Sequence, residues 1–193
     1  STGAWVKSQV ASSSTGTAAI AVSGTNPATI VYNQWNTRRI YVTEGPDFLN
    51  GQTLIQSYGV DQGPPLSLKY FGDKRHLVYA YTHDMYTHYN VKYSTDTSGS
   101  WQTTTLVTSG PGVSGLDLSM DPDGKAHVVH CNQDDNMLYS SNHTGAWKTV
   151  TVLNGTCGGS NLDTLYHDGI LFVVYRNEGH FLSLLKIDPA ILN

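Results

Sequence analysis

Four segments of this chain combine polar, charged and aromatic side chains, and each follows a short apolar run. Flat aromatic rings can stack on the apolar face of a sugar, and planar amide, carboxylate and guanidinium groups can hydrogen bond to pairs of hydroxyls. The sequence therefore predicts ligand-binding side chains here, although solvated turn residues would give the same pattern. The candidates are Trp35 and Arg38; Tyr81, His83, Asp84 and Tyr86; Asn132 and Asp134; Arg176 and Glu178.

The same segments contain histidines next to acidic residues, and these are His83, His88 and His180. Imidazole and carboxylate groups can ligate divalent metals, but no tight spacing such as His-Glu-x-x-His is present. We therefore expect no metal and no cofactor. Asp134 and Glu178 are the carboxylates that a glycoside hydrolase would need. No Gly-x-Ser-x-Gly elbow is present, so acyl transfer of that type is not expected, and we assign no catalytic residue.

An internal repeat indicates how these segments are positioned. The pattern Ser/Thr-Gly-Ala/Ser-Trp ends at Trp5, Trp101 and Trp147, which are 96 and 46 residues apart. A degenerate copy near Gly51–Ile55 completes four periods. Each period contains strand-like runs separated by turn signals. In the second period the runs are Leu66–Phe71, His76–Tyr81, Asn90–Ser94 and Trp101–Val107; in the third they are Leu116–Met120, His127–Asn132, Met137–Ser141 and Trp147–Leu153.

Four antiparallel strands in each period of about 40–50 residues are typical of β-propeller blades. We predict an all-β, four-bladed propeller that forms a single domain over residues 1–193. Its blades span roughly 17–57, 64–107, 115–153 and 160–193, and residues 3–10 supply the last strand of the fourth blade and close the ring. A β-sandwich is the alternative, because sandwiches space short strands similarly.

Composition excludes two classes of partner. The formal net charge is −4 and charged residues make up 13%, so the basic surface of a nucleic-acid-binding protein is missing. The longest apolar run, Ile170–Tyr175, is far shorter than a membrane-spanning helix, so no membrane insertion is expected. The chain shows no charged segment followed by an apolar core at its start, so we expect no signal peptide within it, and its first residue, Ser1, fits either a cleaved leader or removal of Met. Two sequons, at Asn142 and Asn154, fit either a secreted or a cytoplasmic protein.

The second strand of each repeat predicts the core. Tyr32, Tyr79 and Tyr175 occupy one position in three repeats, and His130 takes the same place in the other, so all four are expected to be buried. Cys131 and Cys157 fall on one face of the third blade. A disulfide between them is plausible and would add about 3 kcal/mol, but two free thiols remain the alternative.

The segments Ser94–Trp101 and Ser140–Trp147 resemble the Asp-box turn of sialidase-type propellers. Glycine falls one residue later than in that pattern, and the second copy has Asn in place of Asp. Together with Asp121–His130, the repeats are similar to those of microbial and fungal β-propeller lectins. The resemblance implies a folding role for this turn, so Asp96 and Trp101 are not interpreted as catalytic.

We therefore expect an extracellular carbohydrate-binding protein, a lectin without catalysis, whose partner is a glycan or glycoconjugate. Polar groups are spread over all four blades, as repeated binding sites would be. A glycoside hydrolase or lyase on the same fold is the first alternative. A defence or inhibitor propeller that binds proteins through Tyr and Trp is the second. The oligomeric state is not specified by the sequence.

Overall fold

A computed structural model describes residues 15–24, 26–34, 39–45, 48, 52–56, 65–84, 88–109, 112–155, 157 and 161–193 of the chain. At positions 15, 52–56, 82–84 and 109 it describes the backbone only. Strands make up almost all of the regular structure in these ranges, and the one short helical element is the 3-10 turn η1 (Pro189–Leu192). None of the helical structure in the described part of the chain is long and apolar enough to cross a membrane.

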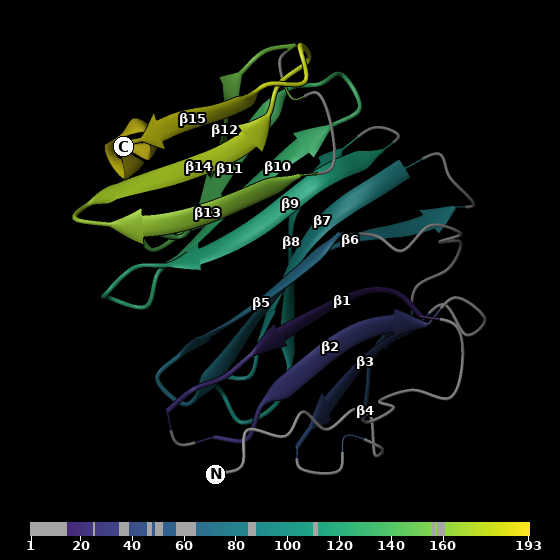
Figure 1. The fold of residues 1–193 in the computed structure, drawn as a ribbon. Helices are drawn as coiled ribbons and strands as arrows, with labels where there is room; N and C mark the ends of the chain where they lie inside the picture. Colours follow the sequence, from purple (N-terminus) through teal and green to yellow (C-terminus); the bar gives the residue numbers. More distant parts are fainter. Residues whose placement is uncertain are drawn as a thin grey trace, which may run out of the picture.

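The strands form four antiparallel sheets, each of which follows chain order from one edge to the other (Figure 1). Sheet A contains β1 (Thr15–Ala21), β2 (Thr29–Gln34), β3 (Arg39–Glu44) and β4 (Gln52–Gln56). Sheet B contains β5 (Leu66–Phe71), β6 (Lys74–Asp84), β7 (His88–Thr95) and β8 (Gln102–Ser109). Sheet C contains β9 (Val113–Met120), β10 (Ala126–Asn132), β11 (Met137–Ser141) and β12 (Lys148–Leu153). Sheet D contains β13 (Leu162–His167), β14 (Ile170–Arg176) and β15 (Leu182–Ile187).

The sheets pack face to face in the order A, B, C, D, with the first strand of each beside the first strand of the next. Three apolar clusters fill the spaces between neighbouring sheets, around Val31 and Leu77, around Val78 and Leu118, and around Val129 and Leu171. Each sheet is therefore buried on both faces wherever it has two neighbours, which explains the nearly continuous apolar character of the second strands. Successive four-stranded sheets in this arrangement are those of propeller blades.

One buried carboxylate joins three of the inner strands. Asp117 in β9 accepts a hydrogen bond from the Ser67 hydroxyl of β5 at 2.6 Å. Its other oxygen accepts from the backbone N–H and the hydroxyl of Thr164 in β13, at 2.7 and 2.8 Å. Sheets B, C and D are therefore linked near their shared edge by polar contacts as well as by apolar packing.

The turns after the third strands of sheets B and C repeat one hydrogen bond. The Oδ1 atom of Asp96 accepts the backbone N–H of Arg75 at 2.8 Å, and the Oδ1 atom of Asn142 accepts that of Ala126 at 2.8 Å. In both sheets the side chain therefore ties this turn to the start of the second strand. The geometry gives Asp96 a structural role, and Trp101 packs under the Arg75 guanidinium at 5.1 Å.

The four sheets form an open arc, and the outer faces of its two ends are exposed. Leu184 in β15 is 59% exposed, whereas the residues at its position in the other sheets, Val42, Tyr93 and Tyr139, are buried. At the other end, Ile20 in β1 is 63% exposed, while Leu68 and Leu118 at the same position are buried. The expected closed ring would bury both faces. Sheets A and D instead lie at opposite ends of the arc (Figure 1).

Among the described residues, sheet D has three strands where the others have four. The segment expected to complete it, residues 3–10, lies outside the described residues. Among the expected core residues, Tyr32, Tyr79 and His130 are buried. Tyr175 is half-buried, because it lies at the border of the exposed end of sheet D.

Candidate functional site

The loops that follow the second and fourth strands emerge at one end of the sheets, which we call the loop end. A cleft with a volume of about 390 Å³ opens there between sheets B and C. It lies within the range of about 300–1,000 Å³ that is usual for small-molecule sites. Its lining combines an aromatic ring, two amides, a carboxylate and a hydroxyl, from Tyr89, Gly112, Val113, Ser114, Asn132, Gln133 and Asp135.

A tight turn between β10 and β11 positions the polar wall of this cleft. The Oδ1 atom of Asn132 accepts the backbone N–H groups of Asp134 and Asn136, at 3.1 and 3.0 Å. Asp135 adopts a φ of +55°, which Asp and Asn tolerate better than other residues with side chains. The side-chain oxygen of Asn132 is therefore used by hydrogen bonds within the turn, while Gln133 and Asp135 form the rest of this wall.

A disulfide anchors the next loop to this turn. Cys131, at the end of β10, is joined to Cys157, with their Cα atoms 5.9 Å apart. The Cys157 N–H also donates to the carbonyl of Asp135 at 2.8 Å, and the Gly155 N–H donates to Oδ1 of Asn136 at 3.0 Å. The segment after β12 is thus held against the turn by one covalent bond and two hydrogen bonds.

Gly112 lies beside this wall, because β9 pairs with β10 and the glycine backbone comes close to the Gln133 side chain. Gly112 has a φ of +91°, and a Cβ atom at this position would lie 3.3 Å from the Cβ of Gln133. Any larger residue would both strain the backbone and narrow the cleft.

A second cleft, of about 600 Å³, lies on sheet D, on the face that no other sheet covers. Its lining is more apolar than that of the first cleft and includes the guanidinium group of Arg176. It consists of Asn161, Leu162, Asp163, Val174, Tyr175, Arg176, His180 and Leu182.

The structure brings some of the predicted ligand-binding residues to these clefts. Asn132 lines the first cleft and Arg176 the second, so the two do not share a site. Asp134 and Glu178 are exposed in their turns and line neither cleft. The ammonium group of Lys92 lies 3.9 Å from the ring centroid of Tyr81 and covers that face of the ring.

The remaining candidates lie beyond what the structure describes. Trp35, Arg38 and Tyr86 fall outside the described residues. His83 and Asp84 belong to β6, but their side chains are not described. The sequence reasoning missed Tyr89, Gln133 and Asp135. Gln133 and Asp135 flank the chosen Asp134 in the same turn, and the sequence carried no signal that would separate them from it.

The largest electrostatic perturbations lie in the interior and not in the clefts. Burial lowers the pKa of His130 to about 4 and raises the pKa values of Tyr79 and Tyr93 to about 12. Burial also raises the pKa of Asp117, against the opposing effect of the hydrogen bond from Ser67. These groups stabilise or specify the fold and are not positioned to touch a ligand in the clefts.

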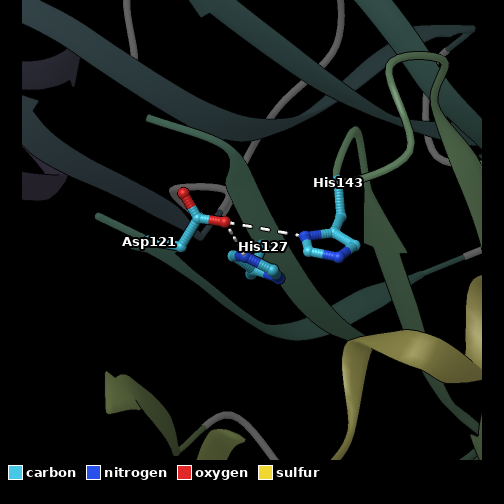
Figure 2. Close-up of side chains that lie close together, drawn as sticks. All are labelled: Asp121, His127 and His143. Atoms are coloured by element: carbon cyan, nitrogen blue, oxygen red, sulfur yellow. Dashed lines mark hydrogen bonds and ion pairs between the residues drawn. The ribbon is translucent and has the colours of Figure 1, made fainter. Parts of the chain in front are cut away.

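A second cluster, made of side chain types that can ligate a metal, lies at the opposite end of sheet C and was not expected. Asp121, His127 and His143 converge there, and Figure 2 shows both imidazole rings facing the same carboxylate. Burial lowers the pKa of His127, while the neighbouring Asp121 opposes that shift. Burial would raise the pKa of Asp121, but hydrogen bonds from Lys125 and His127 lower it overall. The residues lie in separate sequence segments, which is why spacing alone gave no signal.

Comparisons with known proteins show similarity in fold and assign the chain to no family. No protein-family profile matches the chain, and no curated protein matches it. Among solved structures, puromycin hydrolase overlaps with a TM-score of 0.54 at 15% identity, over 93% of this chain and 30% of that one. A xylan β-1,4-xylosidase from Bacillus halodurans C-125 overlaps with a TM-score of 0.49 at 12% identity, over 90% of this chain and 40% of that one. A bifunctional GH43-CE protein from Bacteroides eggerthii overlaps with a TM-score of 0.46 at 10% identity, over 95% of this chain and 25% of that one.

The chain thus spans less than half of each of these solved chains. At 15% identity, the overlap with puromycin hydrolase shows a shared all-β fold and says nothing of substrate.

Proposed function

We propose that the loop end of this protein binds a carbohydrate without transforming it, as a lectin does. The observation that carries this proposal is the cleft between sheets B and C, where Tyr89, Gln133 and Asp135 meet over a volume of about 390 Å³. An aromatic ring beside planar hydrogen-bonding groups suits the alternation of apolar faces and hydroxyl edges on a sugar.

One wall of the cleft is held by a disulfide and by hydrogen bonds within the protein, which favours recognition. The disulfide Cys131–Cys157 and the hydrogen bonds around Asn132 hold the turn that carries Gln133 and Asp135. Ordering flexible side chains and loops costs free energy on binding, so a prearranged wall leaves more of the contact energy for affinity.

Hydrolysis of a glycoside is less well supported. It requires two carboxyl groups on either side of the scissile bond. In the described part of the chain, Asp135 is the one carboxylate that lines the first cleft, and Asp163 is the one that lines the second. The pair considered from the sequence, Asp134 and Glu178, lines neither.

A glycan array followed by titration calorimetry tests the proposal. The array presents neutral and acidic oligosaccharides of plant, animal and microbial types, and the best-bound free oligosaccharide is then titrated into the protein. We expect saturable binding and no turnover of the bound sugar. Absence of any bound glycan at millimolar concentration would overturn the proposal, and release of a cleaved product would replace it with the hydrolase.

Matched variants locate the site. Asp135→Asn keeps a residue that tolerates positive φ and removes the charge, so it should weaken binding without unfolding the protein. Asp168→Asn is the control, since Asp168 has a φ of +49° in an exposed turn at the other end of the sheets. Equal affinities of both variants and the parent protein would exclude this cleft as the site.

We also propose that residues 3–10 add a fourth strand to the edge of β15 that has no partner among the described strands. The support is that, in the described residues, sheet D has three strands where its neighbours have four. Unpaired sheet edges are prone to non-specific pairing with other chains, so an additional strand would protect this one. Hydrogen exchange tests it: the amides of β15 should be protected in the full chain and should lose that protection when residues 1–10 are deleted.

Action outside the cytosol is proposed from the disulfide, since such bonds persist in oxidising compartments. Titration of thiols in the purified, unreduced protein should detect none. Two reactive thiols after denaturation without reductant would remove this support.

A further inference from the structure

Three side chains of types that can ligate metals meet at the end of sheet C opposite the loop end, away from the proposed carbohydrate site. Nε2 of His127 lies 3.3 Å from Oδ2 of Asp121, and Nδ1 of His143 lies 3.7 Å from the same oxygen. All three potential ligand atoms are within 4.8 Å of one another. Asp121 and His127 are buried, while His143 is partly open to solvent.

The carboxylate is held in place by its own turn. Oδ1 of Asp121 accepts the backbone N–H groups of Asp123 and Lys125, at 2.9 and 2.8 Å. These bonds commit one oxygen to the β9–β10 connection and leave Oδ2 directed at the two histidines (Figure 2).

The buried imidazole is oriented from its other side. Nδ1 of His127 is 2.6 Å from the hydroxyl of Tyr139, so Nε2 faces Asp121. The ring of Tyr166 stacks on it at a centroid distance of 4.7 Å. Metal-bound histidines usually have such a partner on the second ring nitrogen, and metal-bound carboxylates usually have a hydrogen bond on the second oxygen.

Sheet B supplies an internal comparison. His76 occupies the register position of His127, and its Nδ1 atom meets the Tyr93 hydroxyl at 2.5 Å, as in sheet C. Its Nε2 atom, however, has no hydrogen-bond partner in the described structure. The shorter turn of sheet B contains no counterpart of Asp121, and Thr97 stands where sheet C has His143. The histidine–tyrosine pair is therefore shared by sheets B and C, whereas the carboxylate and the second histidine are present in sheet C and not in sheet B.

From this arrangement we propose that Asp121, His127 and His143 bind a divalent transition-metal ion such as Zn²⁺. Imidazole and carboxylate ligands suit this class of ion. Tetrahedral bonds of ~2.0–2.1 Å to Zn²⁺ place neighbouring ligand atoms about 3.3 Å apart, close to the two measured separations. The His143 side chain is partly exposed, so water can reach the site and complete the coordination.

Titration with Zn²⁺ and Co²⁺ tests the site, using chain without a histidine tag and freed of metal by chelation. We expect one ion per chain by calorimetry, visible absorption bands of four-coordinate Co²⁺, and a rise in Tm with added Zn²⁺. His143→Ala removes a ligand, so it should weaken Zn²⁺ binding by at least the 10–100-fold that follows loss of a hydrogen-bond partner of a metal ligand. Because His143 is partly exposed, this variant should fold normally.

His167→Ala is the matched control. Nε2 of this exposed histidine lies 3.2 Å from Asp168 in the β13–β14 turn of sheet D, which corresponds to the β9–β10 turn of sheet C. It should bind Zn²⁺ as the parent protein does. Asp121→Asn provides a second variant of the site and should also abolish the Co²⁺ bands. Failure of the parent protein to bind an ion would overturn the proposal, as would equal loss of affinity in His143→Ala and His167→Ala. Neither result bears on the glycan array, because the two sites lie at opposite ends of the sheets.

Discussion

Val174 in β14 and Val129 in β10 occupy the same register position in neighbouring sheets, yet Val129 is fully buried and Val174 is 38% exposed. Sheet D covers Val129, while no described sheet covers Val174. Because residue type and strand position are the same, a comparison of the two valines gives the contribution that packing of one sheet on the next makes to the free energy of unfolding.

Replacing each valine by alanine should give very different losses of stability. Val129→Ala removes two buried methyl groups and leaves a cavity, so the free energy of unfolding should fall by about 2–3 kcal/mol. Val174→Ala should cost less than about 1 kcal/mol. Urea unfolding followed by tryptophan fluorescence measures both. Equal losses would show that the outer face of sheet D is covered in solution.

The strands were predictable because their signals are local. Alternation, β-branched residues and Asp-Gly turns specified β5, β9, β10 and β11 to within a few residues of the observed bounds. Whether the sheets close a ring was not predictable in the same way. A repeat shows that each sheet packs on the next, but the rotation between sheets depends on packing between distant side chains, and four sheets here form an arc.

The site was predictable only in part, for a related reason. Asn132 was found because it lies in a polar loop after a buried strand. Tyr89 and Gln133 come from different sheets and are brought together by the packing of B on C, which no spacing in the sequence encodes. The same holds for Asp121, His127 and His143.

Asp117 and Asp163 form a second register pair, one buried between inner strands and one exposed. Asp117→Ala would remove the acceptor for Ser67 and Thr164, so we expect a loss of about 2–4 kcal/mol in the free energy of unfolding. Asp163→Ala should change it by no more than about 1 kcal/mol, because its exposed carboxylate only shares the Thr164 N–H, at 2.9 Å. Chemical denaturation of both variants provides the comparison. A small effect of Asp117→Ala would mean that Ser67 and Thr164 find other partners.

Reduction of the Cys131–Cys157 bond should act on stability and on the cleft together. The bond closes a loop with a sequence separation of 26, so its loss should lower the free energy of unfolding by about 3 kcal/mol. It should also weaken carbohydrate binding, because the loop after β12 loses its covalent anchor beside Asp135. A Cys131→Ala/Cys157→Ala double variant, compared with the parent protein by calorimetry, checks both effects. Unchanged affinity would show that the hydrogen bonds of Cys157 and Gly155 suffice.

His130 should make the protein less stable as pH falls. Burial lowers its pKa to about 4, against about 6.5 in an unfolded chain, and neither ring nitrogen has a hydrogen-bond partner in the described structure. Between these two values the unfolded chain binds a proton that the folded protein does not. The stability contributed by neutral His130 is therefore complete above about pH 6.5 and decreases by about 3 kcal/mol on acidification to about pH 4.

His130→Phe tests this, since the other three sheets place a tyrosine ring at the same position. The variant should unfold at a higher urea concentration than the parent protein at about pH 5, with a smaller difference at about pH 7.5. Some pH dependence should remain, because burial also lowers the pKa values of His76 and His127. Parallel pH profiles for the two proteins would show that His130 has the same pKa in the folded protein as in the unfolded chain.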